Sequence, residues 1–222
     1  MRVEWFGQSA FQLSGDGTTV AIDPFGDMTA LSASRGIQWD YPPISADADV
    51  LFVTHEHGDH NAVEAIGGDP HTLRSTAGTL DSPLGQVTAI ASEHDDAAGT
   101  ERGPNTIFVF TLDGVRVAHM GDFGQSGLRE EQAAAIGEVD LLFVPVGGGF
   151  TIGAEQAALV VERIKPRWVV PMHYRTERIG FLEPADEFLA RFERVERPGA
   201  SSFETAELPD GDGPLVVVPA AP

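Results

Sequence analysis

Histidine and carboxylate side chains gather in one six-residue stretch, His55-Glu56-His57-Gly58-Asp59-His60. The stretch directly follows an apolar run, Asp49 to Thr54, of the kind that forms a buried strand. Side chains two residues apart point the same way in an extended chain, and Gly58 lets the backbone turn before Asp59 and His60. Neutral imidazole and carboxylate are ligands that zinc, manganese and iron accept. The stretch therefore predicts a metal site at the end of this strand.

The composition excludes several other kinds of chemistry. The chain has no cysteine, which excludes thiolate ligands, thiolate nucleophiles and disulfides, so any metal must bind to His, Asp and Glu. Lys165 is the only lysine and lies beside Pro166, where neither a Schiff base nor a phosphate-binding loop is supported.

Further ligands must come from elsewhere, because the six-residue stretch cannot complete two coordination spheres. The candidates are His94, Asp122 and His173. Each follows a strand-like apolar run, namely Val87–Ala91, Val115–Ala118 and Trp168–Val170. Ligand-type residues gathered on loops at one edge of a sheet are typical of a functional site.

The elements that would position these residues repeat along the chain. The segment 11–21 returns at 108–118, and 49–53 returns at 140–144. Each pair reads as a hairpin with a Gly-containing turn, followed by a buried strand, which predicts two similar β-rich halves packed as a single domain over residues 1–222. Helices are expected at 61–66, 128–136, 154–164 and 184–192, and a closing hairpin at 204–208 and 215–218. Two sheets with helices outside them is the α/β arrangement that this mixture favours.

These residues carry a resemblance to a known family. The pattern His55-x-His57-x-Asp59-His60, followed by a lone His, a Gly-Asp pair and a late His, resembles the metal motifs of the metallo-β-lactamase superfamily. The segments 144–153 and 170–174 resemble, more narrowly, its small metal-dependent hydrolases near the ascorbate-6-phosphate lactonase-like proteins. The resemblance implies a four-layer αββα sandwich of two similar halves.

The resemblance also implies a role for each ligand. His55, His57 and His94 would hold a first metal ion. Asp59, His60 and His173 would hold a second, with Asp122 bridging the two. We expect two divalent ions, zinc first, with manganese or iron as alternatives.

The expected activity is hydrolysis. A hydroxide between two divalent ions is a nucleophile at neutral pH, because metal binding lowers the pKa of water from about 15.7 to near 7. The sequence therefore predicts a dinuclear metal-dependent hydrolase that cleaves a small ester, lactone or phosphodiester, with Asp59 as the catalytic residue that orients the hydroxide. Two alternatives stay open: a mononuclear iron redox enzyme on the same ligands, and a non-catalytic metal-binding scaffold.

Residues around the ligands have expected roles of their own. The resemblance favours Asp23 as a hydrogen-bond partner of a ligand histidine. We expect packing roles for His119 and Tyr174 and a cleft wall at Gly147–Gly149, and a lid or dimer contact at Trp39–Pro43. The superfamily often has Thr where Phe123 stands, so a polar contact is expected to be missing there.

Charge sets the expected partners. The chain has 34 acidic against 14 basic residues, a net charge of −20, which would repel a nucleic-acid backbone and an anionic membrane. No apolar run reaches the roughly 18 residues of a transmembrane helix, and no export signal is evident, so we expect a cytoplasmic protein. We also expect a small-molecule substrate, and the sequence leaves homo-oligomerisation open.

Overall fold

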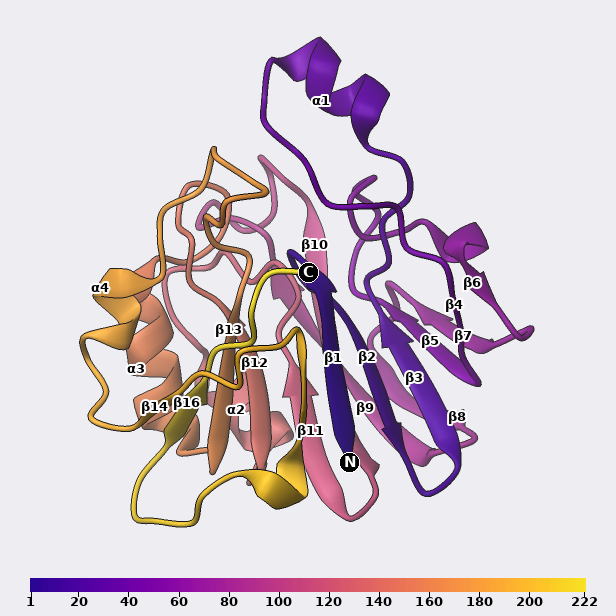
Figure 1. Ribbon diagram of the computed structural model, residues 1–222. Coiled ribbons are helices and arrows are strands. Elements are labelled where there is room, and N and C mark those ends of the chain that lie inside the picture. The colour runs from indigo at the N-terminus through magenta and orange to yellow at the C-terminus, as the bar shows by residue number, and fades with distance from the viewer.

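A computed structural model describes residues 1–222 as two sheets packed face to face (Figure 1). The six-stranded sheet has the order β15 (Ser202–Glu204), β1 (Arg2–Gly7), β2 (Ala10–Gly15), β3 (Thr18–Ile22), β5 (Val50–Val53) and β7 (His71–Arg74). The eight-stranded sheet has the order β14 (Val195–Glu196), β16 (Leu215–Val217), β13 (Trp168–Met172), β12 (Leu141–Pro145), β11 (Val115–His119), β10 (Pro104–Leu112), β9 (Gly85–Glu93) and β8 (Gly78–Ser82). A small third sheet pairs β4 (Ala46–Asp47) with β6 (Ile66–Gly67).

The main core fills the space between the two large sheets. Phe52 of β5 stacks on Phe108 of β10, with ring centroids 4.8 Å apart, and Phe11 of β2 lies 4.5 Å from Phe143 of β12. All four rings are fully buried. Burial of side chains this large is the main favourable contribution to the free energy of folding.

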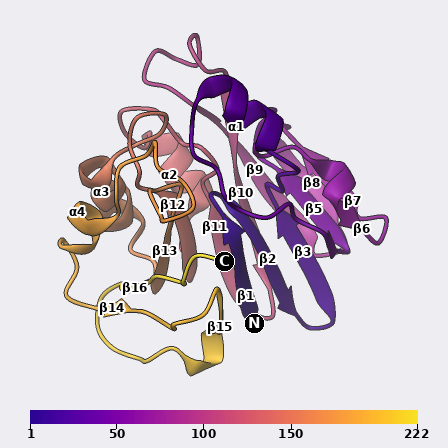
Figure 2. The ribbon, with the colours of Figure 1, turned by 45° about the horizontal axis from the view of Figure 1, so that its top comes forward.

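Helices cover the outer face of the eight-stranded sheet (Figures 1 and 2). They are α2 (Glu130–Ile136), α3 (Ala154–Ile164) and α4 (Asp186–Leu189). Helix α3 buries Ala157, Val160, Val161 and Ile164, a helical spacing of apolar residues. It ends at Lys165, which adopts a left-handed conformation before Pro166.

The outer face of the six-stranded sheet has a thinner cover. Leu51 and Val53 of β5 point away from the main core into a second cluster of 13 buried residues, with Phe25, Trp39 and Tyr41. This cover is mostly irregular chain, with the 3-10 helix η1 (Val63–Ala65) and the helix α1 (Thr29–Arg35), which stands apart at the top of Figure 1. The αββα arrangement is confirmed, with one helical layer much reduced.

The internal repeat is confirmed down to single hydrogen bonds. The β2–β3 and β10–β11 hairpins both turn through Asp-Gly pairs with positive φ, and each second strand pairs in parallel with the next buried strand, β5 or β12. Asp49 accepts a hydrogen bond from the Thr19 amide at 2.8 Å, and Asp140 accepts the equivalent one from the Arg116 amide at 2.8 Å. The two halves therefore share one local geometry.

The expected closing hairpin is wrong. β15 pairs with β1 of one sheet, while β16 pairs with β13 and β14 of the other. The stretch between the two strands contains the 3-10 helix η2 (Thr205–Glu207). The two strands pair with strands of different sheets. Pairing with those edges replaces local pairing, which a pattern of apolar residues alone could not indicate.

Three of the four expected helices are present, and α2 and α4 are shorter than expected. Helix α3 has the predicted range, while α2 starts two residues later than expected. The expected helix at 61–66 is only the 3-10 turn η1, because Ile66 already pairs with Ala46 in a strand. Helix α1 was not predicted, since its sequence Thr-Ala-Leu-Ser-Ala-Ser-Arg has no apolar stripe. No helix in the structure is long and apolar enough to span a membrane.

Candidate metal centre

The predicted ligand residues meet where four strands end. The stretch from His55 to His60 follows β5. His94 follows β9, Asp122 lies three residues after β11, and His173 directly follows β13. These strands belong to both sheets, so the structure brings together all seven residues that the sequence singled out.

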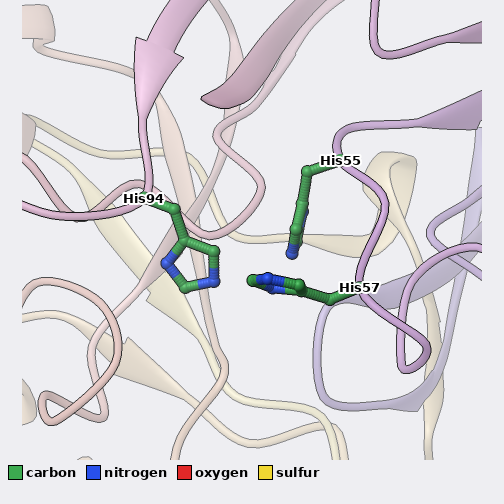
Figure 3. A group of neighbouring side chains, drawn as sticks. All are labelled: His55, His57 and His94. Atoms are coloured by element: carbon green, nitrogen blue, oxygen red, sulfur yellow. The ribbon is translucent and has the colours of Figure 1, made fainter. Parts of the chain in front are cut away.

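Three histidines form a first group. The ligand-type atoms of His55, His57 and His94 all lie within 4.8 Å of one another. Figure 3 shows their imidazoles pointing toward a common centre, His55 and His57 from one loop and His94 from the end of a strand across from it. This arrangement suits a single divalent ion with three nitrogen ligands.

A second group lies beside the first. Its members are Asp59, His60 and His173, whose ligand-type atoms also lie within 4.8 Å of one another. Two imidazoles and a carboxylate make a second donor set that a divalent ion accepts.

Asp122 lies between the two groups. Its Oδ2 atom is 3.2 Å from Nε2 of His60, of His94 and of His173, and 3.9 Å from Nε2 of His55. One carboxylate oxygen thus contacts histidines from both groups.

Asp23 organises the histidines from behind. Its Oδ2 accepts hydrogen bonds from the Thr54 hydroxyl at 2.7 Å and from Nδ1 of His60 at 3.0 Å. Because the Thr54 hydroxyl donates to Asp23, it accepts from Nδ1 of His55, 2.9 Å away. In their neutral forms both histidines therefore carry the proton on Nδ1, which leaves the Nε2 lone pair of each available for a ligand bond.

Asp23, His55 and His60 also form a close group of potential ligands. The Oδ1 atom of Asp23 accepts the Thr54 amide at 2.8 Å, so both its oxygens already have hydrogen-bond donors. Asp23 is thus engaged as the hydrogen-bond partner that the sequence favoured.

Asp122 is held by the chain on either side. The Ser9 hydroxyl donates to its Oδ1 at 3.1 Å, and its own amide donates to the Asn105 side chain at 3.0 Å. Gly121 before it has φ +57, and a Cβ there would lie 2.3 Å from Oδ1 of Asn105. Only glycine allows this close approach.

His119 has a positioning role as well as a packing one. Its ring packs between Phe11 and Phe143. Nδ1 accepts the Gly121 amide at 3.2 Å, so Nε2 carries the proton and donates to the Ser9 carbonyl at 3.0 Å. His119 therefore links the two backbone segments that hold Asp122.

The electrostatics of the site suit a cation. Burial and the neighbouring His60 lower the pKa of His55 to about 3, so that its imidazole is neutral at neutral pH. Although burial raises the pKa of Asp122, the imidazoles of His173 and His60 hold it well below its usual value. Burial lowers the pKa of His60, but the carboxylates of Asp122 and Asp59 outweigh it and raise that pKa well above normal. The two carboxylates thus favour positive charge between them.

The residues fit a bound metal by a second criterion. Nε2 of His55 and of His60 is buried and has no hydrogen-bond partner in the structure. Buried polar atoms are almost always paired, because an unpaired one costs about 1–3 kcal/mol. Both atoms face Oδ2 of Asp122, at 3.2 Å for His60 and 3.9 Å for His55. A metal ion is a partner that these donor atoms could share.

A cavity of about 310 Å³ opens on the ligand residues. Its lining includes His57, Asp59, His94, Asp122 and His173. It also includes Arg35, Arg102 and six apolar side chains, those of Met28, Leu31, Ile37, Trp39, Phe150 and Phe181. A larger cavity of about 1460 Å³ lies among α3 and the loops near Pro214, away from every histidine. Of the two, only the smaller cavity is lined by the residues of the candidate metal centre.

Other predicted residues take definite places. Gly147 packs tightly beneath His173, because a Cβ there would lie 2.1 Å from the His173 carbonyl oxygen, and Phe150 just beyond it lines the cavity. Tyr174 stacks on Trp5 with ring centroids 5.6 Å apart, and Phe123 is fully buried in the main core. These residues support the site by packing.

The segment Trp39–Pro43, expected to be a lid or a dimer contact, has both of its aromatic side chains packed into the fold. Trp39 and Tyr41 are buried, and Tyr41 donates or accepts a 2.7 Å hydrogen bond with Thr176. Trp39 still lines the cavity, and α1, just before it, contributes Leu31 and Arg35. The part of the chain that stands over the cavity is therefore α1.

Sequence reasoning missed several residues that shape the site. Ser9, Thr54 and Asn105 are ordinary polar residues whose partners are distant in sequence, so no local pattern marks them. Arg102, which lines the cavity, lies in a polar loop with the same appearance as any surface turn.

Comparisons with known proteins find a matching family model and similar hydrolases. Residues 2–173 match the β-lactamase superfamily domain. A UPF0173 metal-dependent hydrolase of Methylobacterium nodulans is 32% identical over 99% of this chain and 96% of its own. A second, from Thermococcus kodakarensis, is 30% identical over 79% of this chain and 85% of its own.

A solved structure from Thermotoga maritima is also similar along the whole chain. It is described as a candidate Zn-dependent hydrolase of the metallo-β-lactamase superfamily, with 29% identity and a TM-score of 0.77 over 99% of both chains.

Proposed function

Since the chain belongs to the metallo-β-lactamase superfamily, among its metal-dependent hydrolases, we propose that it is a dinuclear enzyme that cleaves a small ester, lactone or phosphodiester. His55, His57 and His94 would hold one ion, and Asp59, His60 and His173 would hold the other. Asp122 would bridge the two. Zinc is the first expectation for both ions, which the description of the Thermotoga maritima protein supports.

The position of Asp122 carries this proposal. A single oxygen at 3.2 Å from three histidine Nε2 atoms, two in one group and one in the other, is what a bridging ligand requires. A mononuclear iron site would need only one of the groups, so the presence of two complete groups favours the dinuclear form. The open cavity beside them favours an enzyme over a scaffold.

When bound, divalent ions at these groups supply a Lewis acid and a water molecule whose pKa is lowered to near 7. The chain's own residues position the reaction. Asp23 and Thr54 orient His55 and His60, while Ser9 and Asn105 orient Asp122. Asp59 is only partly buried and lines the cavity, where its carboxylate would orient the attacking water.

The size of the cavity limits the substrate. A volume of about 310 Å³ is at the lower end of the range for small-molecule sites, and a polymer would not fit in it. The net charge of −20 further disfavours a polynucleotide.

The test is metal content together with hydrolysis, measured for the wild type and for His57→Ala and Asp122→Ala. Purification avoids chelators and nickel columns. We expect about two zinc or manganese ions per wild-type chain. We also expect turnover of at least one ester, lactone or phosphodiester. Both variants should lose metal and turnover.

His71→Ala is the matched control, because His71 is exposed at the edge strand β7 and lies outside both groups. It should keep metal content and activity. Full activity in either site variant contradicts the proposal, as does one iron per wild-type chain with oxygen consumption. Metal that only raises the melting temperature, with no hydrolysis of any substrate, would support the scaffold instead.

A further inference from the structure

The cavity beside the metal centre contains two arginines, Arg35 and Arg102, among its 14 lining residues. The chain has 34 acidic and 14 basic residues, so carboxylates are abundant on its surface. Ion pairs with carboxylates occupy five arginines, namely Arg2, Arg74, Arg129, Arg163 and Arg167. Neither cavity arginine has a carboxylate partner, and the Arg102 side chain makes no hydrogen bond in the structure.

Arg102 is held in place by an aromatic ring. Its guanidinium lies over Phe150, 4.2 Å from the ring centroid. A cation in this position is stabilised by the ring's quadrupole, by about 0.5–1 kcal/mol at an exposed site. The contact fixes the plane of the guanidinium while leaving its N–H donors unused, and both side chains line the cavity.

The backbone that carries Arg102 is also fixed. The Asp95 carboxylate accepts the amides of Ala97, Gly99, Glu101 and Arg102, at 2.9, 2.8, 3.1 and 2.7 Å. The His94 amide donates to the Gly103 carbonyl at 3.1 Å, which closes the loop. Arg102 is therefore tied through eight residues of rigid loop to a ligand of the first group.

The remaining wall of the cavity accepts hydrocarbon. Leu31, Ile37, Trp39 and Phe181 present apolar surface there. A ligand that satisfies the whole cavity thus needs an apolar portion and an oxyanion, because a guanidinium pairs best with a carboxylate or phosphate.

We propose that Arg102 is the anion-binding residue of the pocket, so that the substrate is a small apolar ester or lactone that also carries a carboxylate or phosphate group. The identification of the ligand as a substrate rests on the proposed hydrolase function. The presence of an anion site at Arg102 does not depend on that function. Arg35, on α1, adds positive potential at the mouth.

The test is calorimetric binding to the protein as purified, with hexanoate, hexyl phosphate and the neutral hexanamide as probes. Wild type should bind at least one anion about 10-fold more tightly than the amide, the value of a typical charge-assisted hydrogen bond. The better of the two anions identifies the oxyanion. Arg102→Leu should abolish the preference, and Arg102→Lys should restore part of it.

Arg191→Leu is the matched control, because it removes the same charge from an exposed arginine beside the larger cavity. It should keep the wild-type preference. A preference that survives in Arg102→Leu, as it would if the metal ions alone bound the anion, overturns the proposal. So does an equal loss in Arg191→Leu.

A kinetic pair separates this inference from the proposed function. Mono(4-nitrophenyl) glutarate is an anionic ester, and 4-nitrophenyl valerate is a neutral ester of the same length. Arg102→Leu should lower kcat/KM for the first about 10-fold and leave the second unchanged. Binding that depends on Arg102 without any hydrolysis refutes the function but keeps the anion site; hydrolysis with equal loss for both esters refutes the anion site alone.

Discussion

Hydrogen bonds behind the ligands decide which histidine nitrogen faces the metal centre. The Asp23 carboxylate, the Thr54 hydroxyl and the Nδ1 atoms of His55 and His60 form one connected network. Its direction follows from the carboxylate, which can only accept. A single side chain, fully buried at the end of β3, therefore sets the tautomer of two ligands from different groups.

Changing Asp23 to Asn tests this network. The amide supplies a donor where His60 and Thr54 need an acceptor, so we expect metal affinity to fall about 10- to 100-fold while the protein stays folded. Titration against a competing chelator measures the affinity. Asp49→Asn is the control, because Asp49 accepts a backbone amide but contacts no ligand. An equal loss of affinity in both variants would refute the orienting role.

Tight turns at the ends of the strands position the candidate ligands Asp122 and His173. β11 ends at His119, and the chain reaches Asp122 through Gly121, whose positive φ and close approach to Asn105 and Thr54 leave no space for a side chain. His173 itself adopts φ +50 directly after β13. Backbone strain of this kind is held in place by the surrounding structure and is typical of functional sites.

The variant Gly121→Ala tests the turn. A Cβ would lie 2.3 Å from Asn105 and 2.7 Å from Thr54, so the turn must shift, and we expect unfolding free energy to fall by about 1–3 kcal/mol. Metal content should fall as well, since Asp122 moves. Urea unfolding and elemental analysis measure the two effects. Gly127→Ala, at an open position without positive φ, should change neither; a Gly121→Ala protein with wild-type metal content would contradict this account.

Both halves of the molecule contribute residues to the proposed metal centre. His55 to His60 follow a strand of the six-stranded sheet, whereas His94, Asp122 and His173 follow strands of the eight-stranded sheet. Metal ions bound at the centre would therefore connect the two sheets in addition to the aromatic core between them. A metal ion that binds the folded protein but not the unfolded protein stabilises the folded state by mass action.

Removal of the metal should lower the melting temperature of the wild-type protein. A thousandfold excess of free metal over its Kd contributes about 4.1 kcal/mol of stability, which a chelator would abolish. Thermal melts with and without chelator, and again after zinc is added back, measure the effect. Asp122→Ala should show a much smaller difference. Identical melts for loaded and chelated wild type would show that the ions do not link the halves.

The sequence by itself determined the features that local pattern controls. These features are the cluster from His55 to His60, the Asp-Gly hairpins and helix α3, each of which depends on residues close together in the chain. The internal repeat and the αββα class could be predicted from the sequence as well. Tertiary structure alone decided which sheet β15 and β16 would join, where α1 stands, and how Ser9, Thr54 and Asn105 meet the ligands. It also decided that Arg102 would lie over Phe150 beside the metal centre. The physical reason is the same in each case: these contacts join residues far apart in the chain, and their energy depends on packing that no local pattern records.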